Sequence, residues 1–300
     1  MLCVTCYVNI IKYRKFYFIF SGLLFAISLA SFIFWGLKLG IDFTGGSLLE
    51  VEFRNQPFNF QEIQDKLKPL DLGEINIQPT GERGVILRFK NIDELTHQSI
   101  LSSLGDVEEK RFESVGPVVG EELKSRAIGA IGLSLIMIVA YIAWAFRKVS
   151  RPVPSWQYGA AALAALFHDV VVPAGVFSLL GHFWDVEIGL LFVTALLTVL
   201  GFSVHDTIVV FDRIRENLRR GFGGDFEDKV NASVNQTLVR SINTSLSVLL
   251  TLLAIYFLGG ATVRLFALVL IIGIICGTYS SIFIASPLLV VWARWGRKSR

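Results

Sequence analysis

Five ionisable side chains fall inside or at the edge of long apolar stretches, where a charged group is costly. They are His168, Asp169, His205, Asp206 and Arg240. Ionisable groups inside membrane-spanning helices are rare, and by default they are candidates for proton or ion pathways. The chemistry that these residues suggest is therefore the binding and release of a proton by a carboxylate.

Asp206 is the leading candidate for this chemistry. Ser203 lies one helical turn before it and Thr207 lies beside it, so polar groups share its helix. A second polar stripe recurs at helical spacing along the next apolar run, through Arg240, Asn243 or Thr244, Ser247 and Thr251. If the two helices are antiparallel neighbours, the stripes can face each other and Asp206 can pair with Arg240. Burial disfavours the charged form of a carboxyl while a guanidinium favours it, so a shift of the helices could change its protonation.

Other interpretations of these residues stay open. Asp206 could be a structural ion pair or an end residue that reaches toward water. Asp169 has no evident partner except His168 and His205, and both histidines could be neutral, hydrogen-bonded groups between helices. A zinc site built from the two His-Asp pairs is the least favoured interpretation, and no metal, cofactor or catalytic constellation is expected.

The elements that must position these residues are membrane helices. Hydrophobic residues make up 53% of the 300 residues and charged residues 18%, whereas soluble domains carry about 25% charge. The net charge of +3 is too small to indicate a nucleic-acid partner. A helix needs about 20 mostly apolar residues to cross a bilayer. Six spans are predicted, over 16–36, 127–146, 157–180, 188–211, 240–258 and 265–292.

Basic residues in the short flanks predict the orientation. One side carries Lys12, Arg14, Lys15, Arg147, Lys148, Arg151, Arg213, Arg215, Arg219, Arg220, Lys229, Arg294, Arg297, Lys298 and Arg300. The opposite short loops, 181–187 and 259–264, offer only Arg264. Both termini, the loop 212–239 and the tail 293–300 are therefore expected in the cytoplasm, with 37–125 outside. A signal peptide is the rival interpretation of the N-terminal run, but that run continues to Trp35.

The outer segment 37–125 reads as a small soluble domain. Alternating and helical patterns predict a βαββαβ order, the ferredoxin-like arrangement. The predicted strands are 47–54, 74–79, 83–90 and 107–115, and the predicted helices are 58–68 and 92–104, the second opened by Asp93. Strand 83–90 is expected to pair with strand 74–79 through the turn at 80–82. Without a His/Cys cluster or a nucleophile, this domain is typical of a recognition or lever element.

The cysteines and small residues receive structural interpretations. Cys3 and Cys6 form a CxxC without a second pair of ligands, so we interpret them as incidental thiols. Cys276 lies in an apolar run, where cysteine behaves as a small hydrophobe. Gly273 and Gly277 form a GxxxG, which is typical of close helix packing in membranes.

Several longer motifs resemble the SecF family, which supplies the smaller subunit of the bacterial SecDF protein-export complex within the RND superfamily. They are GIDFTGGSLLEVEF (40–53), GPVVGEELK (116–124), LFHDVVVPAG (166–175), VHDTIVVFDRIREN (204–217) and NQTLVRSINTS (235–245). The resemblance extends over nearly the whole chain in the same order. It implies six spans, a ferredoxin-like outer domain, and a helix bundle that is half of a 12-helix RND unit.

The same resemblance implies partners and a mechanism. SecF-like proteins pair with SecD, associate with the SecYEG channel and possibly with YajC and YidC, and use the proton gradient to draw preproteins outward. The intramembrane carboxylate and arginine of the family fall on Asp206 and Arg240. His205 stands where the family usually has Asn, which leaves open whether a second titratable group takes part.

The leading functional hypothesis is thus a proton-coupled accessory subunit of the Sec translocase in the bacterial cytoplasmic (inner) membrane. The alternative is a half-size RND-type exporter of small molecules, although an outer region of about eighty residues is small for a binding cleft. A membrane enzyme would need a nucleophile, base or metal constellation that the sequence does not offer. A passive scaffold would not need Asp206 and Arg240. The pattern leaves H⁺ and Na⁺ open as the coupling ion.

Overall fold

The computed structural model describes residues 8–54, 59–81, 83–147, 153–221 and 224–298. The chain divides into two compact units. We call the first the membrane unit; it comprises residues up to Lys38, Ala130–Val186 and Leu191 onward. The second, the sheet unit, comprises Leu39–Gly129 and the short segment Glu187–Leu190.

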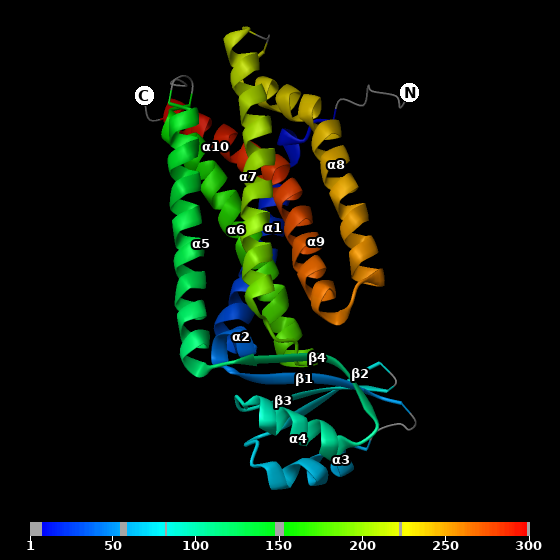
Figure 1. Cartoon of the computed structure of the whole chain (residues 1–300). Helices are drawn as coiled ribbons and strands as arrows, with labels where there is room; N and C mark the ends of the chain where they lie inside the picture. Colours follow the sequence, from blue (N-terminus) through cyan, green and yellow to red (C-terminus); the bar gives the residue numbers. More distant parts are fainter. Residues whose placement is uncertain (1–7, 55–58, 82, 148–152, 222–223, 299–300) are drawn as a thin grey trace. The chain divides into compact units, whose positions relative to one another are not determined.

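Within the described residues, six helices are long and apolar enough to cross a membrane, which confirms the predicted multi-pass class. They are α1 (Arg14–Trp35), α5 (Pro117–Ala145), α6 (Ser155–Trp184), α7 (Leu190–Arg219), α8 (Phe226–Leu258), and α9 (Ala261–Ser280), which continues through the π-helical segment η3 (Ser281–Ala285) into α10 (Ser286–Lys298). A short 3-10 turn, η1 (Ile11–Tyr13), precedes α1. Figure 1 shows α6, α7, α8 and α9 running alongside one another.

The helices extend beyond the apolar runs, and most of the expected loop 212–239 is helical. Helix α7 continues to Arg219, and α8 begins at Phe226 instead of 240. Asp225 explains this early start, because it forms a capping box with Asp228: each side chain accepts a hydrogen bond from the other residue's backbone N–H. Such a box satisfies two donors that a helix start leaves free.

Helix α1 packs on α6 through small polar residues. Ser28 and Ser31 are buried, and a Cβ on Gly175 would collide with the backbone of Ser28. Ser31 Oγ donates to the carbonyl of Gly175 at 3.1 Å, and Ser178 Oγ donates back to the carbonyl of Ser31 at 2.9 Å.

The GxxxG of α9 forms a close contact with α7. A Cβ on Gly273 would collide with the side chain of Val199, and one on Gly277 would lie 2.9 Å from Ser203 Cβ. Only glycine at these two positions allows the helices to approach so closely, as expected for small-residue packing in membranes. Cys276, between them, is buried. Cys3 and Cys6 lie outside the described residues.

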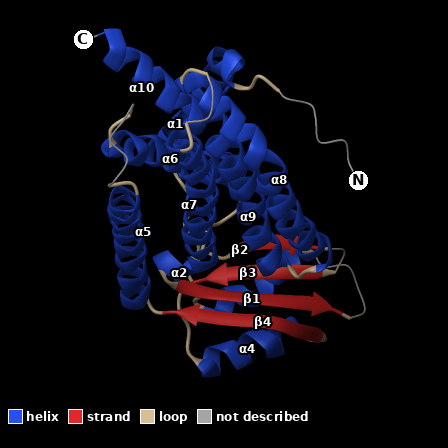
Figure 2. Cartoon of the chain, turned by 90° about the horizontal axis from the view of Figure 1, so that it is seen from above, coloured by secondary structure: helices blue, strands red, loops and turns tan. Residues whose placement is uncertain are grey.

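The sheet unit contains a four-stranded antiparallel sheet in the order β2-β3-β1-β4 (Figure 2). Its elements follow the predicted βαββαβ order: β1 (Gly46–Phe53), α3 (Phe60–Leu67), β2 (Asn76–Thr80), β3 (Gly84–Phe89), α4 (Glu94–Leu104) and β4 (Val107–Val115), with a 3-10 turn η2 (Lys68–Leu70) after α3. The predicted pairing of the second and third strands is confirmed by β2 and β3, although Glu82 of the predicted turn lies outside the described residues. Helices α3 and α4 lie on one face of the sheet (Figure 1), and their apolar side chains form a core with those of the strands.

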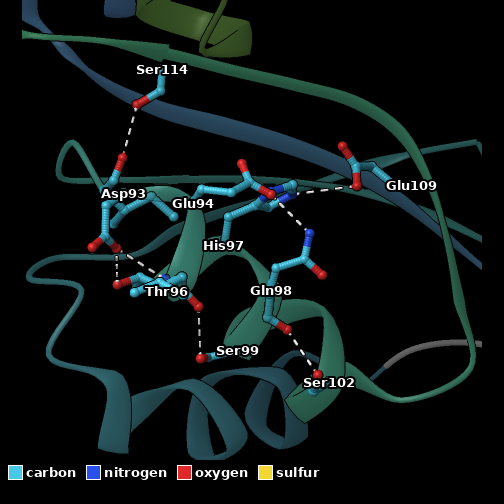
Figure 3. Close-up of polar contacts among 11 residues, drawn as sticks. Asp93, Glu94, Thr96, His97, Gln98, Ser99, Ser102, Glu109 and Ser114 are labelled. Carbon is cyan, nitrogen blue, oxygen red and sulfur yellow. Dashed lines mark hydrogen bonds and ion pairs between the residues drawn. The ribbon is translucent and has the colours of Figure 1, made fainter.

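Helix α4 begins where Asp93 predicts it to begin. The Asp93 carboxylate accepts hydrogen bonds from the Thr96 backbone N–H at 3.0 Å and from the Thr96 hydroxyl at 2.6 Å (Figure 3). One turn later the buried ring of His97 lies with Nδ1 3.3 Å from Glu94 Oε1 and Nε2 3.3 Å from Glu109 Oε2. This cluster ties α4 to β4.

The residues just before β1 contact residues 187–190, which lead into α7. Helix α2 (Ile41–Thr44) contains Asp42. Leu39, two residues before the start of this helix, forms an isolated β-bridge with Ile188. Arg88 forms an ion pair with Glu187, Nε to Oε2, at 3.1 Å. Gly45 follows with φ +74°, and a Cβ there would lie 2.7 Å from the backbone of Pro117. The DFTGG motif thus combines a short helix, a glycine with a positive φ and a close backbone approach.

Candidate proton-coupling site

Asp169, on α6, is fully buried in the membrane unit and surrounded by hydrogen-bond donors. Its Oδ2 accepts from Ser203 Oγ of α7 and from Ser280 Oγ of α9, each at 2.6 Å. Its Oδ1 lies 3.0 Å from His168 Nδ1. Pro173, four residues further along α6, lacks the N–H that would otherwise bond to the Asp169 carbonyl. The site therefore lies where the helix ladder of α6 is interrupted.

Asp206, on α7, is also buried, with 7% of its surface exposed. Ser241 Oγ of α8 donates to its Oδ1 at 2.5 Å, and Ser281 Oγ donates to its Oδ2. Within the described part of the chain, no Arg or Lys lies within ion-pair distance of either Asp169 or Asp206. Two carboxylates buried among hydroxyls, without a fixed cation, can bind and release a proton without first breaking an ion pair.

The predicted pair of Asp206 and Arg240 does not form in this structure. Arg240 is exposed, and the described residues offer its guanidinium no hydrogen bond or ion pair. The neighbouring residue Ser241 points inward instead, because consecutive residues of a helix point about 100° apart. Ser245, one turn further, contacts Thr278 Oγ1 of α9 at 2.5 Å.

Helix α8 consequently carries two polar stripes. The inner one, Ser241 and Ser245, faces the site. The outer one, which we call the α8 stripe, consists of exposed residues: Arg240, Asn243, Thr244, Ser247 and Thr251. The sequence alone predicted the outer stripe as the face toward Asp206, and the structure corrects this.

The remaining candidates divide between the site and the surface. Ser203 and His168 belong to the site, and His168 Nε2 has no hydrogen-bond partner among the described residues. Thr207 is buried on α7 beside Asp206, whereas His205 and Asn243 are exposed. Among the residues that the structure describes, no three His, Cys, Asp or Glu side chains could hold a metal ion, so the zinc interpretation gains no support.

Three donors of the site, Ser241, Ser280 and Ser281, were not predicted. Ser280 and Ser281 are adjacent in the last apolar run, and because they are uncharged they do not stand out there as ionisable residues do. The signal that could have identified them is two consecutive serines in a span, since a buried hydroxyl needs an acceptor.

The C-terminal part of α7 and the N-terminal part of α8 are joined by further side-chain bonds. Arg213 Nε donates to Gln236 Oε1 at 2.6 Å, and Asn217 Nδ2 donates to Ser233 Oγ at 2.8 Å and to Gln236 Oε1 at 2.9 Å. Together with the bond from Ser241 to Asp206, these contacts connect the motif VHDTIVVFDRIREN to the stretch that contains NQTLVRSINTS. The two motifs are thus partners in one helical hairpin.

Comparison with known proteins shows which family shares these motifs. Residues 96–295 match the family described as protein export membrane protein SecD/SecF, C-terminal, and residues 30–57 match the SecD/SecF GG motif. Protein translocase subunit SecF of Thermobaculum terrenum is 46% identical over 95% of this chain and 94% of its own length. The chain belongs to the SecF family. A second SecF, from Anaerolinea thermophila, is 42% identical over 90% of this chain and 91% of its own length.

Other relatives of this SecF-family chain contain SecD and SecF together. Protein translocase subunit SecDF of Brucella abortus is 37% identical over 93% of this chain, which spans 36% of that protein. The crystal structure of SecDF from Thermus thermophilus, which is described as a translocon-associated membrane protein, matches all of this chain with a TM-score of 0.83 and 33% identity. The SecF-family chain covers 40% of that structure. The GG-motif match falls on the DFTGG turn, and the C-terminal match contains both buried carboxylates.

Proposed function

We propose that this protein is an accessory subunit of the Sec preprotein translocase, which uses the proton gradient together with SecD to promote protein export. The family membership supports the export role. The observation that carries the coupling role is the pair of buried carboxylates, Asp169 and Asp206, each held by hydroxyl groups from neighbouring helices.

Such carboxylates suit proton coupling because protonation changes the hydrogen bonds that they can form. An ionised carboxylate accepts hydrogen bonds only, whereas a protonated one also donates. Protonation therefore changes which hydroxyls Asp169 and Asp206 can hold, and so changes the fit between α6, α7, α8 and α9. One charge that crosses the full membrane potential releases about 2.3 kcal/mol per 100 mV, enough to bias a two-state rearrangement of helices.

SecD is the proposed partner, and the α8 stripe supports a protein contact in the membrane. A charged side chain that faces lipid is costly, by up to about 2.5–3.5 kcal/mol at the bilayer centre on insertion scales. An exposed stripe that includes Arg240 is therefore better placed against another helix than against lipid. The bundle is half the size of an RND-type unit, and relatives such as that of Brucella abortus contain SecD and SecF in one chain. Arg240 would then act at the interface with SecD.

The membrane placement follows from the basic flanks. We propose the bacterial inner membrane, with both termini in the cytoplasm and the sheet unit outside, because Lys and Arg collect on one side of the spans. The SecYEG channel, and with it YajC, YidC and the preprotein, are the further partners that this role implies.

Co-purification from native membranes tests the assignment. A tagged chain should retain SecD and channel subunits in mild detergent. Retention of a drug-efflux partner without SecD would instead favour the half-size exporter. Replacing the proton gradient by a sodium gradient in the same membranes then identifies the coupling ion.

A further inference from the structure

Two consecutive serines connect the two buried carboxylates. Ser280 ends α9 and donates to Asp169, and Ser281 begins η3 and donates to Asp206. Consecutive side chains point about 100° apart on a helix, so two adjacent residues can reach two carboxylates on two different helices. Both serines are fully buried, so water cannot replace either contact.

Each of these serines also has a second acceptor on its own helix. Ser280 Oγ lies 3.2 Å from the carbonyl of Gly277, and Ser281 Oγ lies 3.1 Å from the carbonyl of Thr278. A hydroxyl carries a single proton, so it donates fully to one acceptor at a time. An ionised carboxylate is the stronger acceptor. When the carboxylate takes up a proton, that advantage is lost and the backbone carbonyl can take over the bond.

The backbone is unusual at this point. Segment η3 (Ser281–Ala285) is π-helical, and Ser286 Oγ donates to the carbonyl of Ser281 at 2.9 Å. Short π-helical segments inside α-helices are rare and occur frequently at functional sites. A change in the hydrogen bonds of Ser280 or Ser281 therefore acts on a helix segment that already departs from α-helical geometry.

We propose that Ser280 and Ser281 are positioning residues that read the charge of Asp169 and Asp206 together, and that η3 passes the change to α10. The proton binds to and leaves the carboxylates, whereas the serines only exchange acceptors. Because both serines share one backbone step, a change at one carboxylate alters the contacts of the other. This inference rests on the proposed proton coupling, and it names the moving element of that site.

Amide hydrogen exchange tests this proposal on the full chain co-purified with SecD. Asp206→Asn and Ser281→Ala should each raise exchange of the amides of residues 282–286 by about tenfold, the size expected for a lost hydrogen bond to a charged group. The double variant should show no further rise, since both changes remove the same charge-assisted bond between Ser281 and position 206. Asp169→Asn should raise exchange in the same amides, although Ser281 does not bond to Asp169. Ser281→Thr, which keeps the hydroxyl, should restore protection.

Ser178→Ala is the matched control, because Ser178 is a buried serine of α6 that bonds to a backbone carbonyl away from the carboxylates. It should leave the 282–286 amides unchanged. Additive effects of Asp206→Asn and Ser281→Ala, or no response of these amides to Asp169→Asn, would overturn the proposal. Normal gradient-stimulated export by Asp206→Asn would instead refute the proposed function, whatever the amides show, so the two failures are distinguishable.

Discussion

The carboxylate of Asp42 accepts a hydrogen bond from the backbone N–H of Leu190 at 2.7 Å, across 148 residues of sequence. Leu190 is the first residue of α7, so Asp42 caps the helix that carries Asp206. The cap comes from the DFTGG segment, which leads directly into β1. The sheet unit therefore contains the start of a membrane helix that belongs to the candidate site.

Asp42→Ala should destabilise the first turn of α7. Loss of a capping carboxylate costs about 0.5–2 kcal/mol, so faster exchange is expected at the amides of residues 190–193 and a lower thermal midpoint in detergent. Asp42→Asn keeps an acceptor oxygen and should retain most of the protection. Equal protection in the Ala and Asn variants and the native chain would show that the contact contributes nothing.

Gly277→Ala should weaken the packing of α9 on α7. The added Cβ would lie 2.9 Å from Ser203 Cβ, and overpacking of this kind costs about 1–3 kcal/mol. Because Ser203 bonds to Asp169, the substitution should also reduce gradient-stimulated export. Gly201→Ala is the control, since a Cβ there has no neighbour within 4 Å. Thermal unfolding in detergent compares the two; an equally stable Gly277→Ala variant would contradict the close contact.

Arg240→Ala should leave the thermal stability of the isolated chain unchanged, because the side chain is exposed and has no partner among the described residues. The same variant should co-purify less SecD and lose gradient-stimulated export. Arg240→Lys distinguishes charge from geometry, since lysine cannot reproduce a planar, two-point contact. Full SecD retention by Arg240→Ala would remove the α8 stripe from the proposed interface.

In the sheet unit, the cap of α4 by Asp93 should weaken at acid pH. The Thr96 hydroxyl and backbone N–H donate to Asp93 and hold the pKa of that carboxyl below its ordinary value of 3.8. A lowered pKa means that the cap stabilises α4 at pH values above the unfolded pKa, and that this contribution is lost as pH falls through the folded pKa. Thr96→Val should move the Asp93 pKa back up, while Thr96→Ser should not. Carbon-detected NMR of the Asp93 carboxyl measures this; an Asp93 pKa unaffected by Thr96→Val would exclude the hydroxyl as its cause.

The sequence was informative wherever a pattern repeats along one element. Apolar length predicted the membrane helices, alternation predicted β1 to β4, and Asp93 predicted the start of α4. It was wrong about the face of α8, because stripes at 240–251 and at 241–245 both have helical spacing. Packing decides which one is buried. Gly273 and Gly277 bring α9 against α7, and that approach places Ser280 and Ser281 beside the carboxylates.

The capping of α7 by Asp42 could not be predicted for a related reason. Helix caps are recognised from residues next to the helix start, whereas this cap comes from a segment far away in the sequence. The same holds for the ion pair of Arg88 with Glu187. Contacts that depend on how distant segments meet need the structure.

Preprotein release from membrane vesicles, measured with and without a proton gradient, tests whether Asp206 couples export to that gradient. The comparison is between Asp206→Asn and Asp212→Asn, two substitutions on the same helix. Asp212 is exposed and pairs with Arg215, so its loss should leave release normal. Asp206→Asn keeps the shape of the side chain but cannot take up a proton. Proton coupling through Asp206 predicts that this variant is folded and bound to SecD, and that its preprotein release no longer responds to the gradient. Normal gradient-stimulated release by Asp206→Asn would contradict it.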